Sequence, residues 1–405
     1  MKELLITQPD FMETFSCVGA ACREHCCKGV SITLDKNRYQ RYIKSPYSDI
    51  KRIAISHISV TQDSLASWAN INPDNQGNCP FLDEQRLCQI YKHTGINALS
   101  TSCATYPRVE HIYKNQKIKS MSLSCPEVTR QVLFSADALT LRFSTINQYD
   151  YFKASEIVTE ERLANRACAA LAMNQQENIE ENLWAINQFL QSYQAGNDVN
   201  KIKMAEIDGL RDALISAMAA GGAVNELQAV DPDTALVKVL LACLGHFMTQ
   251  LPDIRGKKTL ANYAHTALAY FTEADPEPQW RNTWSQQAWP FFLQHTSVLR
   301  NYLLYRIHHD QLAMGNELPV AAAFNLVVID YFYLKLLIST YANKNGQLTE
   351  DDIIDIIYSY HACRESTERS SQQFKQELTA LAMSDDFPLL SLLAFSQFSD
   401  AADCA

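Results

Sequence analysis

The chain has 405 residues, of which 47% are hydrophobic and 20% charged, with only 12 glycines and 13 prolines. This composition is typical of a globular protein and excludes a disordered or fibrous chain. The length exceeds what one hydrophobic core usually organises, so two or three domains are expected. The net charge of −10 is uneven: residues 1–150 carry 17 basic and 14 acidic side chains, whereas residues 151–405 carry 18 and 31. No uninterrupted basic face interleaved with aromatic residues appears, which argues against nucleic acid as a partner.

The N-terminus and the most apolar stretch both indicate a cytoplasmic protein. The first residues, MKELLITQPDFMETF, include acidic residues such as Asp10 and Glu13 and lack the long apolar run of a secretory signal. Residues 320–341 are long enough to span a bilayer, but Asp330 and Lys335 within them are costly at the centre of a membrane helix. We therefore expect no membrane insertion and interpret this stretch as a buried helix.

Cysteines divide the chain into two unlike parts. Eight of the twelve lie within the first 125 residues, namely Cys17, Cys22, Cys26, Cys27, Cys79, Cys88, Cys103 and Cys125. The other four are scattered singly, as Cys168, Cys243, Cys363 and Cys404. A reducing cytoplasm keeps cysteines as thiols, so the crowded eight favour metal ligation over disulfides. We interpret the scattered four as small buried hydrophobes.

Short elements are predicted around the first cysteines. Alternation over residues 30–34 predicts a strand, and Asp35 then offers an N-cap for a helix that ends before Pro46. Turn-forming residues over 68–80 place Cys79 in a loop. Loops bring metal ligands together without demanding regular geometry.

Further along, the predicted elements become longer. A short helix is predicted over residues 87–93, with Cys88 in its first turn. Residues 108–113 and 117–123 flank a polar stretch and predict a β-hairpin.

A helix start follows the hairpin. Ser124 with Glu127 predicts a capping box, which places Cys125 at a helix N-terminus, where backbone amides favour the thiolate.

Beyond residue 150, apolar residues recur every three or four positions, which is typical of successive helices. Nine helices are predicted, over residues 152–172, 177–194, 201–219, 231–250, 257–272, 289–312, 317–342, 349–363 and 367–382. The sequence therefore predicts a mainly α protein. A small cysteine-rich α+β domain with a hairpin (residues 1–150) would bind metal, and a larger all-α domain (residues 151–405) would follow.

The thiols point to a soft metal, because thiolates select zinc, copper(I) or iron–sulfur clusters. Their spacing matches neither the double Cys-x2-Cys of a zinc ribbon nor the Cys-x3-Cys-x2-Cys of radical enzymes, since position 29 is glycine. Neighbouring Cys26 and Cys27 diverge in a helix or strand, so both do not easily bind one ion. One four-thiolate site with spare thiols, two sites, or one larger cluster all remain compatible with the spacing. His25, beside Cys26, is a further candidate donor, although a solvated loop histidine is the commoner case.

Four motifs carry a resemblance to a known family. They are FSCVGAACREHCCKG at 15–29, NCPFLDEQRLCQIY at 78–91, SCATYPR at 102–108 and LSCPE at 123–127. In this order they resemble the flagellin lysine N-methylases of flagellated enteric bacteria, part of a wider family of cysteine-cluster proteins regarded as zinc- or iron-chelating. The match covers about residues 10–135 by motif, and the helical remainder fits in length and character. The first cysteines of this chain are spaced more widely than in the Cys-x2-Cys-x2-Cys-Cys pattern of the wider family.

The resemblance implies a protein lysine N-methyltransferase that methylates ε-amino groups of flagellin surface lysines. S-adenosylmethionine is the implied donor, and the eight cysteines would hold a 4Fe-4S cluster or zinc. The alternative is a non-catalytic module, in which the metal only staples the fold and the chain acts as a binding or maturation factor. No Gly-x-Gly-x-x-Gly loop follows a strand, so no Rossmann-type donor pocket is visible.

Lysine attacks only when its amine is deprotonated, so such a site must desolvate the ammonium or offer a base. Tyr91, Tyr106, Asp83 and Glu84 lie near the cysteines in sequence, and we interpret each as structural.

Overall fold

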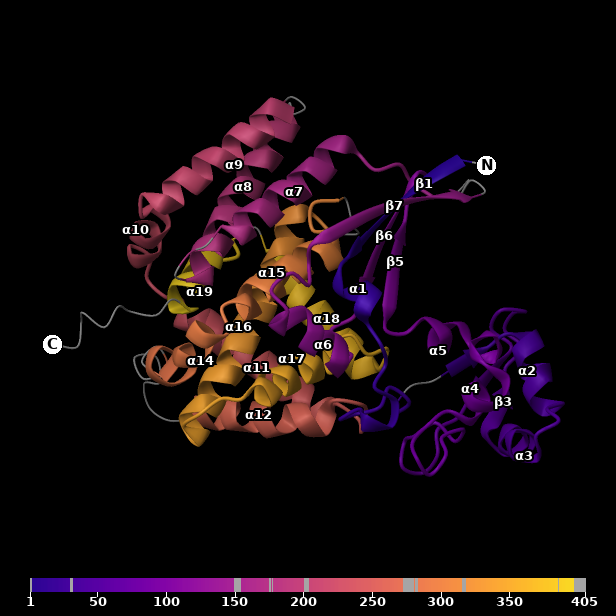
Figure 1. Cartoon of the computed structure of the whole chain (residues 1–405). Coiled ribbons are helices and arrows are strands. Elements are labelled where there is room, and N and C mark those ends of the chain that lie inside the picture. The colour runs from indigo at the N-terminus through magenta and orange to yellow at the C-terminus, as the bar shows by residue number, and fades with distance from the viewer. Residues whose placement is uncertain are drawn as a thin grey trace.

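The structure is a computed structural model that describes residues 2–29, 32–148, 154–174, 176, 178–199, 204–271, 280, 283–314, 318–384 and 386–396. Helices dominate it, and its two small sheets are formed by residues 2–148 (Figure 1). A cysteine-rich α+β region is followed by a helical region, which confirms the predicted fold class.

The larger sheet has the strand order β5-β6-β1-β7. Strands β5 (Arg108–Ile112) and β6 (Gln116–Met121) form the predicted hairpin, with Arg108 opposite Met121. The N-terminal strand β1 (Lys2–Pro9) lies parallel to β6, and β7 (Leu141–Gln148) pairs antiparallel with β1. The sequence analysis does not predict β1 or β7. The chain leaves β1 through α1 (Phe11–Thr14) and η1 (Gly19–Ala21).

The second sheet belongs to a small lobe, which we define as residues 32–105 (Figure 1). Its strands run in the order β2-β4-β3, over Ile32–Leu34, Ala69–Ile71 and Ile58–Val60. Its helices are α2 (Lys36–Ile43), α3 (Ser48–His57), α4 (Gln89–Thr94), η2 (Ile96–Ala98) and α5 (Thr101–Thr105). The predicted cap of α2 is confirmed, because the Asp35 carboxylate accepts the Arg38 backbone N–H at 2.8 Å.

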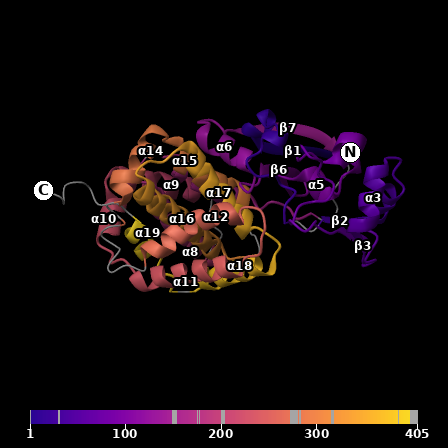
Figure 2. The same ribbon diagram turned by 90° about the horizontal axis from the view of Figure 1, so that it is seen from below.

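The small lobe has a thin core. Eleven buried apolar side chains fill it, namely Ile32, Leu34, Tyr42, Ile50, Ala54, Ala69, Ile71, Phe81, Ile90, Ala98 and Leu99. Viewed from below, the lobe stands apart from the main body of helices (Figure 2). Cys79, Cys88 and Cys103 pack against this core from its edge.

The segment after the hairpin enters helix α6 (Pro126–Phe134). The predicted capping box is wrong by one residue, because Cys125 occupies the N-cap and no side chain caps the helix. The Ser124 hydroxyl instead contacts the hydroxyls of Tyr106 and Ser122, and Glu127 bonds Arg130. Proline at the first helical position, which has a preset φ and no N–H, explains the later start.

The helical region contains the predicted helices, most of them with small shifts of their ends. They are α7 (Thr159–Met173), α8 (Ile179–Val199), α9 (Met204–Ala219), α11 (Thr234–Gln250), α12 (Lys257–Tyr270), α16 (Val320–Asn345), α17 (Glu350–Arg364) and α18 (Arg369–Ala382). The helix predicted over 152–172 begins only at Thr159, and the described residues 154–158 are not helical. The predicted helix over 289–312 is divided into α14 (Trp289–Gln294) and α15 (Ser297–Asp310). The structure also contains a single π-helical turn, η3 (Trp284–Ala288), and the helices α10 (Gly222–Gln228) and α19 (Leu389–Ser396). The predicted residues 152–153, 177, 201–203, 272 and 317 lie outside the described residues.

Helix α16 lies at the centre of this region. By length and composition it is the one helix of the described residues that could cross a membrane, but most of its apolar stretch is buried inside the fold. The surrounding core also takes Phe11, Met121 and Leu123 from the N-terminal part of the chain. The predicted division at residue 150 stays a prediction, and the structure adds that the segment from β6 to α6 packs into the core of the helices.

Three ion pairs are buried in that core. Asp330 on α16 lies 2.7 Å from the guanidinium of Arg306 and 2.7 Å from that of Arg364. Lys335, one turn further along, lies 2.5 Å from the carboxylate of Glu180. Buried charges that are paired in this way are tolerated, whereas loss of one partner is strongly destabilising.

Candidate metal centre

Five of the eight predicted cysteines line one cavity of about 430 Å³, namely Cys26, Cys27, Cys79, Cys88 and Cys103. The cavity lies where the small lobe meets the helical region. Ile32 and Ile71 of the lobe line it together with Ser122 and with Arg255, which lies between α11 and α12. The structure thus brings most of the predicted ligands to one place, although they are up to 77 positions apart in the sequence.

The other three cysteines are neighbours of this group. Burial raises the pKa of Cys22, and the nearby Cys17 and Cys26 raise it further. Burial also raises the pKa of Cys125, to about 11, and Cys22 adds to that effect. Cys22 therefore lies within electrostatic range of Cys17, Cys26 and Cys125.

Backbone pairing fixes the Cys26–Cys27 segment. The Cys79 backbone N–H donates to the Cys27 carbonyl at 2.8 Å, and the Gly29 N–H donates to the Gly77 carbonyl at 2.8 Å. Gly29 has a φ of +64°, and a Cβ there would lie 2.7 Å from the Cα of Ile254. Only glycine allows this close approach of the cysteine segment to the loop that carries Arg255.

Side-chain contacts hold the same segment against the helices. The Glu24 carboxylate accepts the Gly256 backbone N–H at 2.8 Å and the Tyr358 hydroxyl at 3.1 Å. Arg23 forms ion pairs with Asp351 and Asp355 on α17. We call residues 22–29 the docking segment, because it joins the first cysteines to helices that lie more than 220 residues later in the chain.

Arg255 places a positive charge against the thiols. Its Nη1 donates to the Tyr106 hydroxyl at 2.7 Å, and the guanidinium lies 4.9 Å from the centre of the Tyr106 ring. Among the described residues no carboxylate forms an ion pair with it. Its charge acts on Cys22, Cys26 and Cys125 and favours their thiolates.

Most of the cavity thiols keep their protons in the absence of a metal. Burial raises the pKa of Cys79 to about 12, and it also raises the pKa values of Cys88 and Cys103. Cys26 differs, because a hydrogen bond from the Cys27 thiol lowers its pKa to about 6, and that same bond raises the pKa of Cys27. Binding of a soft metal must therefore release protons from this site.

The donors fit a soft metal by their chemistry. The described cysteines are all free thiols, and His25 Nδ1 is buried with no hydrogen-bond partner in the described part of the chain. As they stand, no three histidine, cysteine or acidic side chains of the described residues lie close enough to form a metal-binding group. Thiolate–zinc bonds are about 2.3 Å long, so the cavity must contract for these thiols to enclose an ion.

The two tyrosines near the cysteines in sequence line the cavity, whereas the two acids do not. Tyr91 and Tyr106 both contribute to the lining. Asp83 instead caps its own loop and forms an exposed ion pair with Lys92 at 3.3 Å, and Glu84 is exposed next to it. The two carboxylates are thus structural, as interpreted from the sequence.

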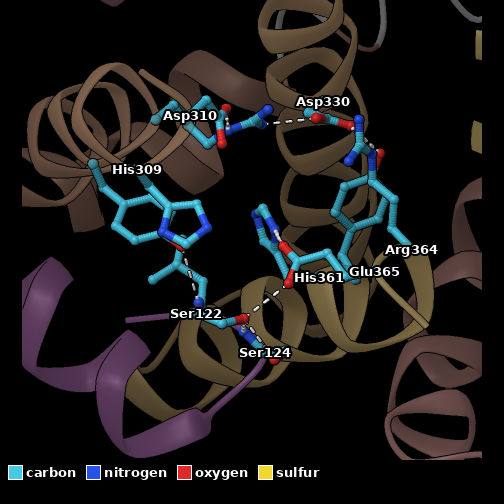
Figure 3. Close-up of polar contacts among 12 residues, drawn as sticks. Ser122, Ser124, His309, Asp310, Asp330, His361, Arg364 and Glu365 are labelled. Atoms are coloured by element: carbon cyan, nitrogen blue, oxygen red, sulfur yellow. Dashed lines mark hydrogen bonds and ion pairs between the residues drawn. The ribbon is translucent and has the colours of Figure 1, made fainter. Parts of the chain in front are cut away.

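A polar network leads from the cavity into the helices (Figure 3). The Tyr106 and Ser124 hydroxyls lie 3.2 Å apart, and those of Ser124 and Ser122 lie 2.7 Å apart. The Ser122 hydroxyl donates to Glu365 Oε2 at 2.8 Å. Glu365, at the end of α17, faces the two serines from the opposite side of the network in Figure 3.

The second oxygen of Glu365 is bound from the interior. His361 Nδ1 lies 2.8 Å from Glu365 Oε1, and His361 Nε2 lies 3.4 Å from the Tyr302 hydroxyl. Burial alone would raise the pKa of Glu365, but the hydrogen bond from His361 and the nearby histidines lower it to about 2. Glu365 is therefore ionised at neutral pH.

The sequence analysis misses Ser122, Glu365 and Arg255. None of them belongs to a motif with a recognisable spacing, and each acquires its neighbours only through tertiary packing. Clustered cysteines can be recognised in a sequence, whereas single polar residues in loops and at helix ends cannot.

Comparison with known proteins identifies the family. Residues 165–393 match the model of the FliB lysine N-methylase C-terminal domain, and residues 16–126 match a CxxCxxCC model described as "putative zinc- or iron-chelating domain". The Lysine-N-methylase of Salmonella typhimurium is 30% identical over 97% of this chain and 100% of its own length, and that of Salmonella choleraesuis is 31% identical over the same shares. The Flagellar biosynthetic protein FliU of Salmonella muenchen is 46% identical over 35% of this chain and 84% of its own. No solved structure matches the chain.

This chain belongs to the FliB lysine N-methylase family. It is a protein-lysine methyltransferase with a metal-binding domain, and its substrate is a protein. The resemblance carried by the four cysteine motifs is confirmed.

Proposed function

We propose that this protein methylates ε-amino groups of flagellin lysines in the cytoplasm, with S-adenosylmethionine as the donor. We further propose that the eight N-terminal cysteines hold an iron–sulfur centre of the 4Fe-4S type, with zinc as the alternative. The observation that carries the proposal is the cavity in which five of these thiols meet Arg255, Tyr106 and Ser122.

The thiol cavity supports a metal centre because its donors are soft and their surroundings are largely apolar. A four-thiolate centre carries net negative charge, which a buried site must balance. Arg255, with no carboxylate partner among the described residues, supplies the opposite charge. When bound, an iron–sulfur centre supplies redox chemistry or an open iron site, and zinc supplies a structural clamp.

The helical region supports the choice of substrate. We propose that residues 151–405 recognise flagellin, because their 31 acidic against 18 basic side chains attract a lysine-bearing surface. The apolar walls of the cavity, among them Ile32 and Ile71, would favour the neutral amine over the ammonium once a lysine enters. The name of the FliU relative adds the flagellar context.

A combined experiment tests both parts of the proposal. The protein is purified without oxygen, its iron, zinc and acid-labile sulfide are measured, and it is then incubated with flagellin and isotope-labelled S-adenosylmethionine. Mass spectrometry should find label on flagellin lysines, and Cys79→Ser should lose it, whereas Cys243→Ser, which lies outside the cavity, should keep it. Binding of flagellin without any label would favour the non-catalytic alternative. Colourless zinc-loaded protein that still transfers label would exclude the iron–sulfur assignment.

A further inference from the structure

We infer that Ser122 and Glu365 form the proton outlet of the cysteine-lined cavity, with Ser124 and Tyr106 as a second entry to it. This inference rests on the proposed methyl transfer and names the residues that carry the proton away from it. Neither the family comparisons nor the cysteine motifs assign any role to these four residues.

Methyl transfer to lysine requires such an outlet. The amine nitrogen forms a bond to the methyl carbon, the carbon–sulfur bond of the methylsulfonium donor breaks, and its electron pair stays on sulfur. The nitrogen begins as an ammonium with a pKa of about 10.4 in water, so one proton must leave before the attack. A second positive charge beside Arg255 in a mostly apolar cavity is unfavourable, and the proton must therefore leave the cavity.

The hydrogen bonds of the network have one consistent direction. A guanidinium can only donate, so Tyr106 accepts from Arg255, and an ionised carboxylate can only accept, so Ser122 donates to Glu365. Between these fixed ends the Tyr106 hydroxyl donates to Ser124, and the Ser124 hydroxyl donates to Ser122. Every hydroxyl proton in the network points towards Glu365.

Both ends of the proposed proton path, from the cavity to Glu365, are suited to their roles. Ser122 and Tyr106 line the cavity, so a leaving proton meets a hydroxyl oxygen there. Glu365 has 33% of its side chain exposed, so its carboxylate exchanges protons with water. Because its pKa is low, Glu365 is a weak base, so it holds a proton only transiently and passes it on to water.

The transfer balances without any further reactant. Ser122 Oγ also accepts the Ser124 backbone N–H at 3.1 Å, so a proton that arrives on this oxygen takes the place of that hydrogen bond and displaces the hydroxyl proton of Ser122 onto Glu365 Oε2. Glu365 passes that proton to water and becomes a carboxylate again. When the proton arrives on Tyr106, the same exchange passes first through Ser124. His361, which binds the other oxygen of Glu365, holds the carboxylate in position.

The test compares hydroxyl and carboxylate variants under single-turnover conditions with flagellin and S-adenosylmethionine. We expect Ser122→Ala and Glu365→Gln to lower the methyl-transfer rate by about 10²-fold, in the range usual for loss of acid–base catalysis. Ser122→Thr and Glu365→Asp, which keep the transferable groups, should recover most of the rate. Added formate should accelerate Glu365→Ala but not the wild type, because the exposed position admits a small carboxylate. Ser371→Ala is the matched control, since it removes a buried hydroxyl bound to the Cys363 carbonyl near the same end of α17.

A purely structural role would give a different pattern. If the Ser122 hydroxyl only held its own loop against α17, formate would not restore the methyl-transfer rate of Glu365→Ala. The thermal stability of the variants would then fall in parallel with their rates. Wild-type rates in Ser122→Ala and Glu365→Gln would overturn the inference.

A second measurement does not depend on methyl transfer. Zinc added to metal-free protein displaces thiol protons, which a pH indicator follows in a stopped-flow instrument. Ser122→Ala and Glu365→Gln should slow this release several-fold relative to Ser371→Ala, and unchanged release would again overturn the inference. An inactive wild type whose proton release is slowed by these variants would instead refute the proposed function and leave the outlet supported.

Discussion

The small lobe and the helical region are stabilised in different ways. The lobe buries eleven apolar side chains and surrounds its edge with protonated thiols. The helical region buries long apolar helices, and its internal charges, such as Asp330 and Lys335, are already paired. A core as small as that of the lobe rarely stabilises a fold without disulfides or a bound metal. We therefore expect metal binding to stabilise the small lobe much more than the helical region.

Removal of the metal should therefore affect the two regions unequally, and this is the largest expected effect. Chelation, or the substitution Cys79→Ser, should unfold the small lobe while the helices stay folded, because binding of a structural metal supplies about 10 kcal/mol or more to a small domain. Hydrogen–deuterium exchange read by mass spectrometry should show the loss of protection within residues 32–105. Cys243→Ser should leave the exchange pattern unchanged. Equal loss of protection in α16 would contradict the comparison.

Asp330→Ala tests whether the buried ion pairs stabilise the helical region. It leaves Arg306 and Arg364 buried without their partner, and it should lower the free energy of unfolding by about 3–5 kcal/mol. Urea unfolding followed by circular dichroism measures the change. Asp208→Ala, which removes an exposed partner of Arg211, should cost less than about 1 kcal/mol. Similar costs for the two variants would show that the buried network does not stabilise the helices.

Arg255 joins the two regions, and its substitution should weaken the metal site without unfolding either one. Arg255→Met keeps the length of the side chain and removes the charge beside Cys26. We expect the affinity for metal to fall by about 10- to 100-fold, as for other residues that support metal ligands. Competition with a chromophoric chelator measures it. Arg86→Met, at an exposed cation near the same cysteines, is the control and should change the affinity little.

The smallest effect concerns pH. Burial lowers the pKa of His308 to about 4, and its Nε2 lies 2.9 Å from the Lys119 carbonyl. The folded state thus holds this histidine neutral. Its contribution to the free energy of unfolding is complete at pH values above the unfolded-state pKa of about 6.5, and this contribution is lost as the pH falls towards 4. Since His308 is partly exposed, we expect a loss on the order of 1 kcal/mol between pH 7 and pH 5. Thermal unfolding of His308→Gln over this range should show a weaker dependence on pH than the wild type, and an identical dependence would refute the assignment.

The sequence predicts regular elements well where local signals act alone. Asp35 caps its helix as expected, and the hairpin over residues 108–123 forms as predicted. The sequence fails where tertiary pairing decides: β1 becomes a strand because β6 and β7 lie beside it. Helix α19 is short, and no local sequence pattern predicts the packing that buries its apolar residues.

The candidate site follows the same rule. The cysteine motifs predict the thiols and the family, because eight thiols in a fixed order are specific. Arg255 and Glu365 are not predicted, since they lie in the loop before α12 and at the end of α17, whose packing against residues 22–29 and 122–125 cannot be inferred from the sequence. A resemblance therefore finds the metal donors but not the residues that balance their charge or carry their protons.

The docking segment has a consequence for biosynthesis. The ribosome makes residues 22–29 early, yet Gly29 packs against Ile254, and Glu24 binds the Gly256 backbone N–H and the Tyr358 hydroxyl, only after more than half of the chain has been translated. Until then the earliest thiols have no fixed environment and are open to oxidation or to the wrong ion. Delivery of the cofactor must accordingly follow translation, so the part of the chain that is synthesised first is the last to be finished.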